Sequence, residues 1–286
     1  MPDLNRLSRP AGQPLHRSEL LLHLKEPDYS RPLLRITSAQ KRVICDLLER
    51  LYGSARAESC FIEVERVMQV YFAHKPPQLI ENDSAFDPYN RFTEKDVVAI
   101  TYGDLIQSPG KKPLATLVSI VDAYLRGTVN TLHILPFFPH SSDRGFSIID
   151  YRQVDPELGT WEEIEDLSTR FSLMFDGVIN HVSSKSEWFQ EFLDGNPEYR
   201  DFFIAFDSED AIPEADLRQI LRPRTSSLLT RFQTLRGDRY VWTTFSADQV
   251  DLNFSNERVL IRVLEVLLYY VRRGADMIRL DAATYL

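Results

Sequence analysis

The spacing of hydrophobic residues divides the chain into a helical part and a part in which strands and helices alternate. In residues 1–95, apolar side chains recur at intervals of three and four, over 43–51 and again over 59–73. This spacing predicts amphipathic helices and no strand ladder. Gly53 is placed to end the first helix, and Pro76-Pro77 to end the second. We expect a helical extension that packs against the following domain.

From Asp96 onward, short β-branched runs alternate with helical stretches. The expected strands span 97–102, 129–135, 172–179 and 275–280, and the expected helices span about 113–126, 161–170 and 256–273. Ser255 and Gly274 are candidate caps of the last helix. Apolar strands in strand–helix–strand repetition predict a parallel sheet buried on both faces, either open and doubly wound or closed as a barrel. Between the third strand and the last helix lies an excursion of about 70 residues, a length that is generally functional.

Composition and charge exclude several classes of protein. The formal net charge of −9 argues against nucleic acid or an anionic membrane as the main partner, since both would repel the chain. No apolar run is long enough to span a membrane, and the N-terminus lacks the apolar core of a secretory signal. We therefore expect a cytoplasmic protein. Cys45 and Cys60 fall in helical apolar patterns, which favours two small buried side chains over a disulfide or a metal pair.

Polar and aromatic residues collect near the carboxyl ends of the predicted strands. These ends meet at one rim of a parallel α/β structure, where catalytic groups gather. The candidates from this pattern are Asp143, Phe146, Asp176, Asn180, His181, Arg279 and Asp281. Each alone is more often an ordinary loop or core polar group. Together they predict a sugar pocket, because carboxylates and amides bind hydroxyls and aromatic rings stack on sugar rings.

Two of these segments resemble hallmark motifs of the α-amylase superfamily, glycoside hydrolase family 13. Residues 174–181 (MFDGVINH) resemble the motif Asp-x-x-x-Asn-His, and residues 274–281 (GADMIRLD) resemble Gly-x-x-x-x-Arg-x-Asp. The segment 135–146 resembles the corresponding segment of the sucrose phosphorylase subfamily. Within this subfamily, the glucosylglycerate phosphorylase branch is the one that residues 222–224 (RPR) and 242–253 resemble, and the helical extension is also similar to that branch. The resemblance extends from about Glu94 to the end of the chain.

The resemblance implies an α/β fold, namely the N-terminal half of a (β/α)8 TIM barrel with about four strands. The implied domains are a helical extension (1–95), the first three barrel strands (96–185), a domain-B-like insertion (186–250), and a helix with the fourth strand (251–286).

The resemblance also implies a role for each candidate residue. Asp281 would be the nucleophile that forms a covalent glucosyl-enzyme. Arg279, two residues earlier on the same face of the strand, would keep it ionised, because a nearby cation lowers the pKa of a carboxylate. The implied substrate-binding residues are Asp143, Phe146, His181 and Phe245, whereas Asp176 and Asn180 would organise the strand ends.

The implied reaction is a double displacement with retention, in which phosphate accepts the glucosyl group of glucosylglycerate or sucrose to give α-glucose 1-phosphate. No metal or other cofactor is expected, and inorganic phosphate is the co-substrate. The expected partners are small molecules, and a half-barrel could also form a homodimer. The alternatives are an α-glucosidase or transglycosidase of the same superfamily, a non-catalytic glucoside-binding remnant, and an interaction module in residues 1–95.

A retaining mechanism needs a second carboxylate about 5 Å from the nucleophile as proton donor. In the resembled family this Glu follows the fifth strand, whereas four strands are predicted before Leu286. We expect the acid/base residue to be absent from this chain. That expectation favours a fragment of a longer protein over an inactive truncated relative or a dimerising half-barrel.

Overall fold

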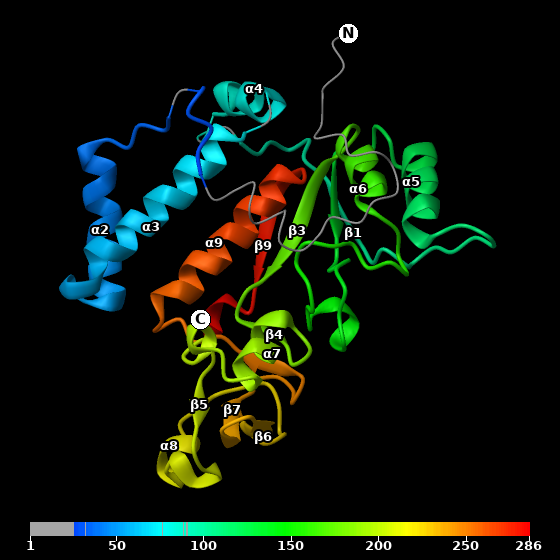
Figure 1. Ribbon diagram of the computed structural model, residues 1–286. Helices are drawn as coiled ribbons and strands as arrows, with labels where there is room; N and C mark the ends of the chain where they lie inside the picture. Colours follow the sequence, from blue (N-terminus) through cyan, green and yellow to red (C-terminus); the bar gives the residue numbers. More distant parts are fainter. Residues whose placement is uncertain (1–25, 32, 76, 88, 90) are drawn as a thin grey trace. The chain divides into compact units, whose positions relative to one another are not determined.

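The computed structural model of the protein describes residues 26–31, 33–75, 77–87, 89 and 91–286 (Figure 1). Its elements follow the predicted change from helices to alternating strands and helices. The chain divides into two units between residues 84 and 85, whereas the sequence pattern places the change after residue 95. The predicted limits of the four domains stay predictions, and residues 1–25 of the predicted extension lie outside the described residues.

The first unit is helical in its described residues. Helix α2 (Ser38–Tyr52) begins with a capping box, in which Gln40 N donates to Thr37 Oγ1 at 3.3 Å and Thr37 N donates to Gln40 Oε1 at 2.9 Å. It ends at Gly53, as predicted, and α3 (Ser54–Ala73) follows directly. Helix α3 ends at Ala73, just before the predicted stop at Pro76-Pro77, and Pro77 begins α4 (Pro77–Ala85), because a first helical turn does not need the N–H that proline lacks. Pro76 lies outside the described residues.

The second unit is built on a parallel sheet with the order β1-β2-β3-β9 (Figure 1). Its strands are β1 (Val98–Thr101), β2 (Thr131–Ile134), β3 (Ser172–Val178) and β9 (Ala275–Asp281). All four lie where they were predicted, and the α/β fold class is confirmed. The register places Asp176 opposite Arg279 and Val178 opposite Asp281. The two predicted motifs therefore end side by side.

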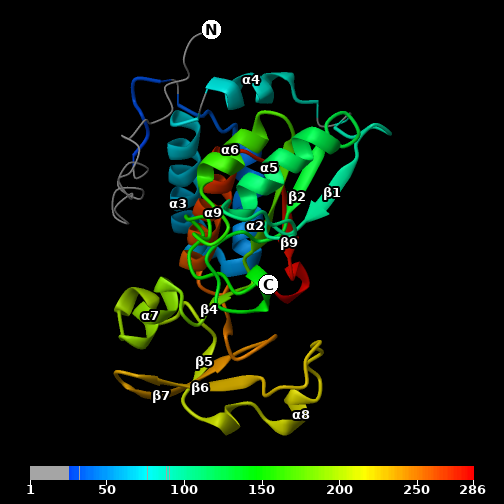
Figure 2. The same ribbon diagram turned by 90° about the vertical axis from the view of Figure 1, so that its right-hand side faces the viewer.

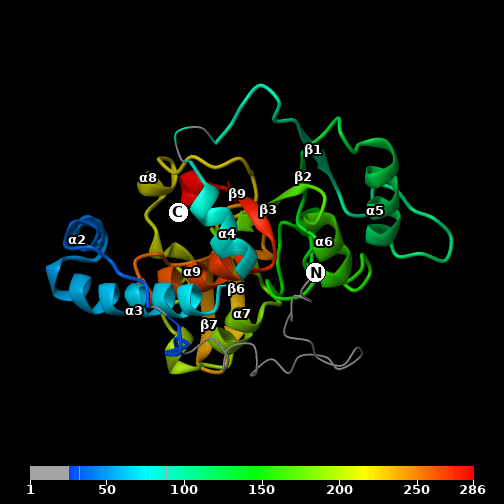
Figure 3. The same ribbon diagram turned by 90° about the horizontal axis from the view of Figure 1, so that it is seen from above.

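The sheet is buried most completely at its centre. Every side chain of β2 is buried, whereas Ile100 of β1 is 64% exposed and Leu280 of β9 is 47% exposed. The prediction of strands buried on both faces is therefore right for the central pair and wrong for the outer two. Each outer strand has a neighbour on one side only, and α5 (Pro113–Tyr124), α6 (Trp161–Ser168) and α9 (Glu257–Arg272) lie along one face (Figure 3).

Aromatic residues form the core beneath the carboxyl end of the sheet. Phe138 stacks on Tyr270 of α9 with ring centroids 4.9 Å apart, and Phe137 meets the edge of Phe175 of β3 at 5.0 Å. All four side chains are fully buried, and burying one such ring stabilises a fold by about 1.5 to 3 kcal/mol. This core anchors the start of the loop that carries the first candidate site residues.

The long connection between β3 and β9 folds into two small antiparallel sheets (Figure 2). Strand β4 (His181–Ser183) pairs with β8 (Gln249–Asp251), and β7 (Gly237–Trp242) lies between β5 (Ala205–Phe206) and β6 (Leu229–Thr234). The helices here are α7 (Glu187–Leu193) and α8 (Glu214–Leu217). The β4–β8 pair returns the connection to the carboxyl end of the parallel sheet.

The last helix, α9, has different caps from those predicted. Its N-cap is Asn256 rather than Ser255, because the Asn256 side chain accepts a hydrogen bond from Arg258 N at 3.1 Å. Its C-cap is Arg273, and the predicted Gly274 follows with a φ of 98°, the left-handed conformation that glycine adopts freely.

Candidate active site

Asp281, the predicted nucleophile, is the last residue of β9. Its Oδ1 lies 3.2 Å from Arg279 Nη2, and 19% of its side chain is exposed. Burial raises the pKa of Asp281 and outweighs Arg279 and His181, which lower it. Arg279 does lower the pKa of this carboxyl, as expected, but the penalty for burying the charged form is larger than the attraction of the partly exposed guanidinium, so the net shift is upward.

Arg279 bridges two carboxylates from neighbouring strands. Its Nη1 donates to Asp176 Oδ1, and its Nη2 faces Asp281. Asp176 is 0% exposed, and its other oxygen lies 2.8 Å from His133 Nε2 of β2. The sequence reasoning missed His133. Its signal was a second polar residue two positions after Thr131, on one face of an otherwise apolar strand.

The backbone turns sharply just after Asp281. Ala282 has a φ of 49°, a left-handed conformation that L side chains rarely adopt. The next turn is held in place because Asn180 Nδ2 donates to Tyr285 O at 2.6 Å. Such strained positions collect at functional sites.

A second strained turn carries Asp143 to the same rim. Asp143 and Arg144 have φ values of 53° and 50°, and Gly145 follows at 104°. A Cβ at Gly145 would lie 2.5 Å from Pro136 O, so this turn passes too close to the chain for any side chain. The guanidinium of Arg144 covers the ring of Tyr102 at 4.4 Å. The carboxylate of Asp143 is left facing the connection between β3 and β9.

Gln249, the first residue of β8, connects Asp143 to His181. Its Nε2 donates to Asp143 Oδ2 at 3.0 Å and to Phe146 O at 3.2 Å, and it lies 3.1 Å from His181 Nε2. Both His181 and Gln249 are buried, and burial lowers the pKa of His181 despite its hydrogen bond to Phe146 O and the nearby carboxylates of Asp281 and Asp143. A buried imidazole with a lowered pKa is suited to hydrogen bonding without charge. His181 Nδ1 lies 3.1 Å from Asn180 Oδ1, which orients the ring.

Two phenyl rings border these polar groups. The ring of Phe245 lies 5.1 Å from the ring of His181, and Arg279 Cζ lies 5.9 Å from the ring of Phe146. The structure thus brings together all the predicted site residues, namely Asp143, Phe146, Asp176, Asn180, His181, Phe245, Arg279 and Asp281. Their roles stay predictions. Gln249 is an addition, because nothing in its local sequence shows that it reaches a residue 106 positions earlier.

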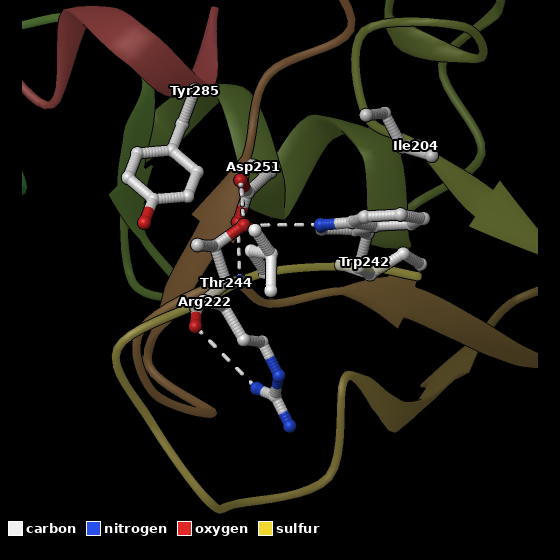
Figure 4. A pocket seen from close by; sticks show the side chains of 8 residues that line it. Ile204, Arg222, Trp242, Thr244, Asp251 and Tyr285 are labelled. Atoms are coloured by element: carbon white, nitrogen blue, oxygen red, sulfur yellow. Dashed lines mark hydrogen bonds between the residues drawn. The ribbon is translucent and has the colours of Figure 1, made fainter. Parts of the chain in front are cut away.

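A pocket of about 120 Å³ lies beside this site and contains a buried carboxyl (Figure 4). Asp251 Oδ2 accepts from Thr244 N at 2.7 Å, and Asp251 Oδ1 accepts from Thr244 Oγ1 at 2.6 Å. Trp242 Nε1 in turn donates to Thr244 Oγ1 at 3.0 Å. Burial raises the pKa of Asp251 to about 6, although the hydrogen bonds from Thr244 oppose the shift. Tyr285 closes one side of the pocket, and Arg222 lies at another.

Within the described ranges of 26–286, no three or more His, Cys, Asp or Glu side chains are grouped so that they could hold a metal ion. No helix there has the length and apolar character needed to cross a membrane. The expectation that the protein works without a metal or cofactor stays a prediction.

Known proteins are similar to about two thirds of this chain. Residues 122–286 match the family described as "Alpha amylase, catalytic domain". Glucosylglycerate phosphorylase of Spirochaeta thermophila is 52% identical over 191 residues, which are 67% of this chain and 32% of that protein. Glucosylglycerate phosphorylase of Escherichia coli is 46% identical over 194 residues, covering 68% of this chain and 34% of that protein.

A solved structure matches the same part of the chain. The crystal structure of sucrose 6F-phosphate phosphorylase from Thermoanaerobacter thermosaccharolyticum has a TM-score of 0.61 at 34% identity, and the match covers 68% of this chain and 41% of that one. The chain therefore spans about a third of the length of the curated relatives it matches.

Proposed function

The chain belongs to the α-amylase catalytic-domain family and is similar to glycosyl-transferring phosphorylases, and we propose that the protein transfers a glucosyl group from glucosylglycerate to phosphate, with retention, to give α-glucose 1-phosphate. Glucosylglycerate is preferred over sucrose as the donor. The supporting comparison is the identity of 46% to 52% with glucosylglycerate phosphorylases, against 31% to 35% with sucrose phosphorylases.

In the proposed first step, a carboxylate oxygen of Asp281 attacks the anomeric carbon. The bond from that carbon to the glycerate oxygen breaks, this oxygen takes a proton from the second carboxylic acid that a retaining mechanism requires, and a glucosyl ester of Asp281 forms. Arg279 holds Asp281 in line, since its guanidinium is anchored on the fully buried Asp176 and reaches the nucleophile with its second nitrogen. The fork geometry of arginine suits this double contact.

The remaining groups bind the sugar. Asp143 and the amide of Gln249 supply an acceptor and a donor for hydroxyls, and the buried His181 adds a ring nitrogen. The rings of Phe146 and Phe245 cover the apolar face of the sugar. In the second step, a phosphate oxygen attacks the same carbon from the side that the leaving group vacated, which restores the α configuration. Phosphate is a co-substrate here, and no other cofactor takes part in the proposal.

The bridge of Arg279 between Asp176 and Asp281 is the observation that carries this proposal. Its test uses α-glucosyl fluoride, because fluoride leaves without being protonated and the result does not depend on an acid/base residue. With this donor and phosphate we expect glucose 1-phosphate to form. Asp281→Asn, which keeps the shape of the side chain, should abolish the product.

The same assay separates the proposal from its alternatives. Release of free glucose at a rate that phosphate does not change would indicate an α-glucosidase rather than a phosphorylase. Binding of the donor without release of fluoride would indicate a glucoside-binding protein. Each of these results contradicts phosphate as the acceptor.

A further inference from the structure

We propose that Asp248 is a positioning residue, whose carboxylate ties the turn that carries Asp143 to β4 and β8 and so fixes the groups that bind the sugar. The inference deepens the proposed function and rests on it. Asp248 lies just before β8, in the connection between β3 and β9, and none of its contacts reaches Asp281 or Arg279 directly.

Hydroxyl groups from two other segments converge on this one carboxylate. On Oδ2 it accepts hydrogen bonds from Ser142 at 2.5 Å, from Ser147 at 2.8 Å and from Ser141. On Oδ1 it accepts a hydrogen bond from Ser184 at 2.6 Å. The first three serines belong to the loop after β2, and the fourth follows β4. One side chain thus joins three segments that are far apart in the sequence.

Backbone contacts strengthen the same junction. Ser184 N donates to Asp248 O at 2.8 Å, and Ser183 N donates to Ile148 O at 2.9 Å. Ser141 N donates to Ser147 O at 3.1 Å, which closes the base of the loop. Burial alone would raise the pKa of Asp248, but the serine hydroxyls lower it to about 2. The carboxylate is therefore charged at neutral pH, and hydrogen bonds to a charged acceptor are stronger than neutral ones.

The junction lies on both sides of the sugar-binding groups. Ser142 and Ser147 flank Asp143, whose left-handed φ of 53° needs support from its surroundings. Gln249 directly follows Asp248 and donates to Asp143 Oδ2. Loss of the Asp248 carboxylate would therefore free two sugar-binding groups at once, namely the carboxylate of Asp143 and the side-chain amide of Gln249.

The test compares Asp248→Ala with Asp276→Ala. Asp276 is a matched control, because its carboxylate also accepts a hydrogen bond across strands, from Leu173 N at 2.9 Å, but at the opposite end of β3 and β9. We expect Asp248→Ala to accelerate amide hydrogen exchange in residues 141–149 and 246–250 together. It should also weaken glucose binding, measured by titration calorimetry, by at least about tenfold. Asp276→Ala should do neither, and Asp248→Asn should lie between wild type and Asp248→Ala.

The inference is overturned if Asp248→Ala loses thermal stability but keeps wild-type exchange in residues 141–149 and wild-type affinity for glucose. That outcome would mean that the carboxylate stabilises the fold without positioning the site. Failure of the proposed function has a different signature. A wild-type protein that binds glucose but makes no glucose 1-phosphate from α-glucosyl fluoride contradicts phosphorolysis, while the comparison of exchange and glucose affinity still decides the role of Asp248.

Discussion

Replacing Asp251 by asparagine should make the protein more stable at neutral pH. Asp251 is 3% exposed, and its pKa of about 6 reflects a carboxylate whose burial is only partly offset by hydrogen bonds from Thr244. Asparagine has nearly the same shape and carries no charge. Its Oδ1 can accept from Thr244 N, and its amide nitrogen can donate to Thr244 Oγ1.

The magnitude follows from the two pKa values. The ordinary value is 3.8 and the value in the fold is about 6, so the two differ by about two pH units. At about 1.4 kcal/mol per unit, this difference corresponds to about 3 kcal/mol. The unfolded chain releases this proton as the pH rises past about 4, whereas the folded chain keeps it to about 6. The free energy of unfolding of the wild type should therefore fall as the pH rises from about 4 to about 6, and that of Asp251→Asn should not show this decrease.

Denaturant unfolding at about pH 4.5 and about pH 7 tests this reasoning. Tryptophan fluorescence is a suitable signal, since Trp161, Trp188 and Trp242 are the only tryptophans of the sequence and all lie in the unit that contains Asp251. The advantage of Asp251→Asn over wild type should grow by about 2 kcal/mol or more between the two pH values. Asp216→Asn, at an exposed position of α8, is the control. An advantage that does not change with pH would refute the argument.

Two further substitutions test the strained turn and the ion pair. Gly145→Ala should lower the free energy of unfolding by about 2 kcal/mol more than Gly110→Ala. Both glycines have positive φ, but only the new methyl group at 145 would meet a backbone oxygen, that of Pro136. Equal losses of stability in thermal denaturation would contradict this. Arg279→Ala should cost about 3 kcal/mol in the same measurement, since it leaves the buried Asp176 without its cation. A loss below about 1 kcal/mol would mean that the pair behaves like a surface salt bridge.

The sequence was sufficient to predict those elements that depend on a local pattern of residues. Each predicted strand of the parallel sheet appears because its run of β-branched and apolar residues is bounded by polar turns. The ends of those strands then placed Asp143, His181 and Asp281 at one rim, since parallel strands point the same way. The stop of the second helix before Pro76-Pro77 was predicted, and α3 ends at Ala73. That Pro77 also begins the next helix was not predicted, because this role depends on whether the residues after it continue as a helix.

Contacts between distant segments could not be predicted. Gln249 reaches Asp143 and His133 reaches Asp176 only after the sheet has formed. Gln249 does not stand out among its sequence neighbours, and the polar His133 in an apolar strand does not show which residue it contacts. The net upward shift of the Asp281 pKa was not predicted for a related reason, although Arg279 lowers that pKa as expected. The spacing of two residues shows that Arg279 is near, but burial, which dominates the pKa, is a property of the whole fold.

Mass spectrometry of the protein after brief exposure to α-glucosyl fluoride tests the central claim most directly. The account predicts that the intact protein gains the mass of one glucosyl group and that, after proteolysis, this mass lies on the peptide containing Asp281. Asp281→Asn should gain none. A glucosyl group found on another carboxylate, or an unmodified wild-type protein that still releases fluoride, would contradict the assignment of Asp281 as the nucleophile.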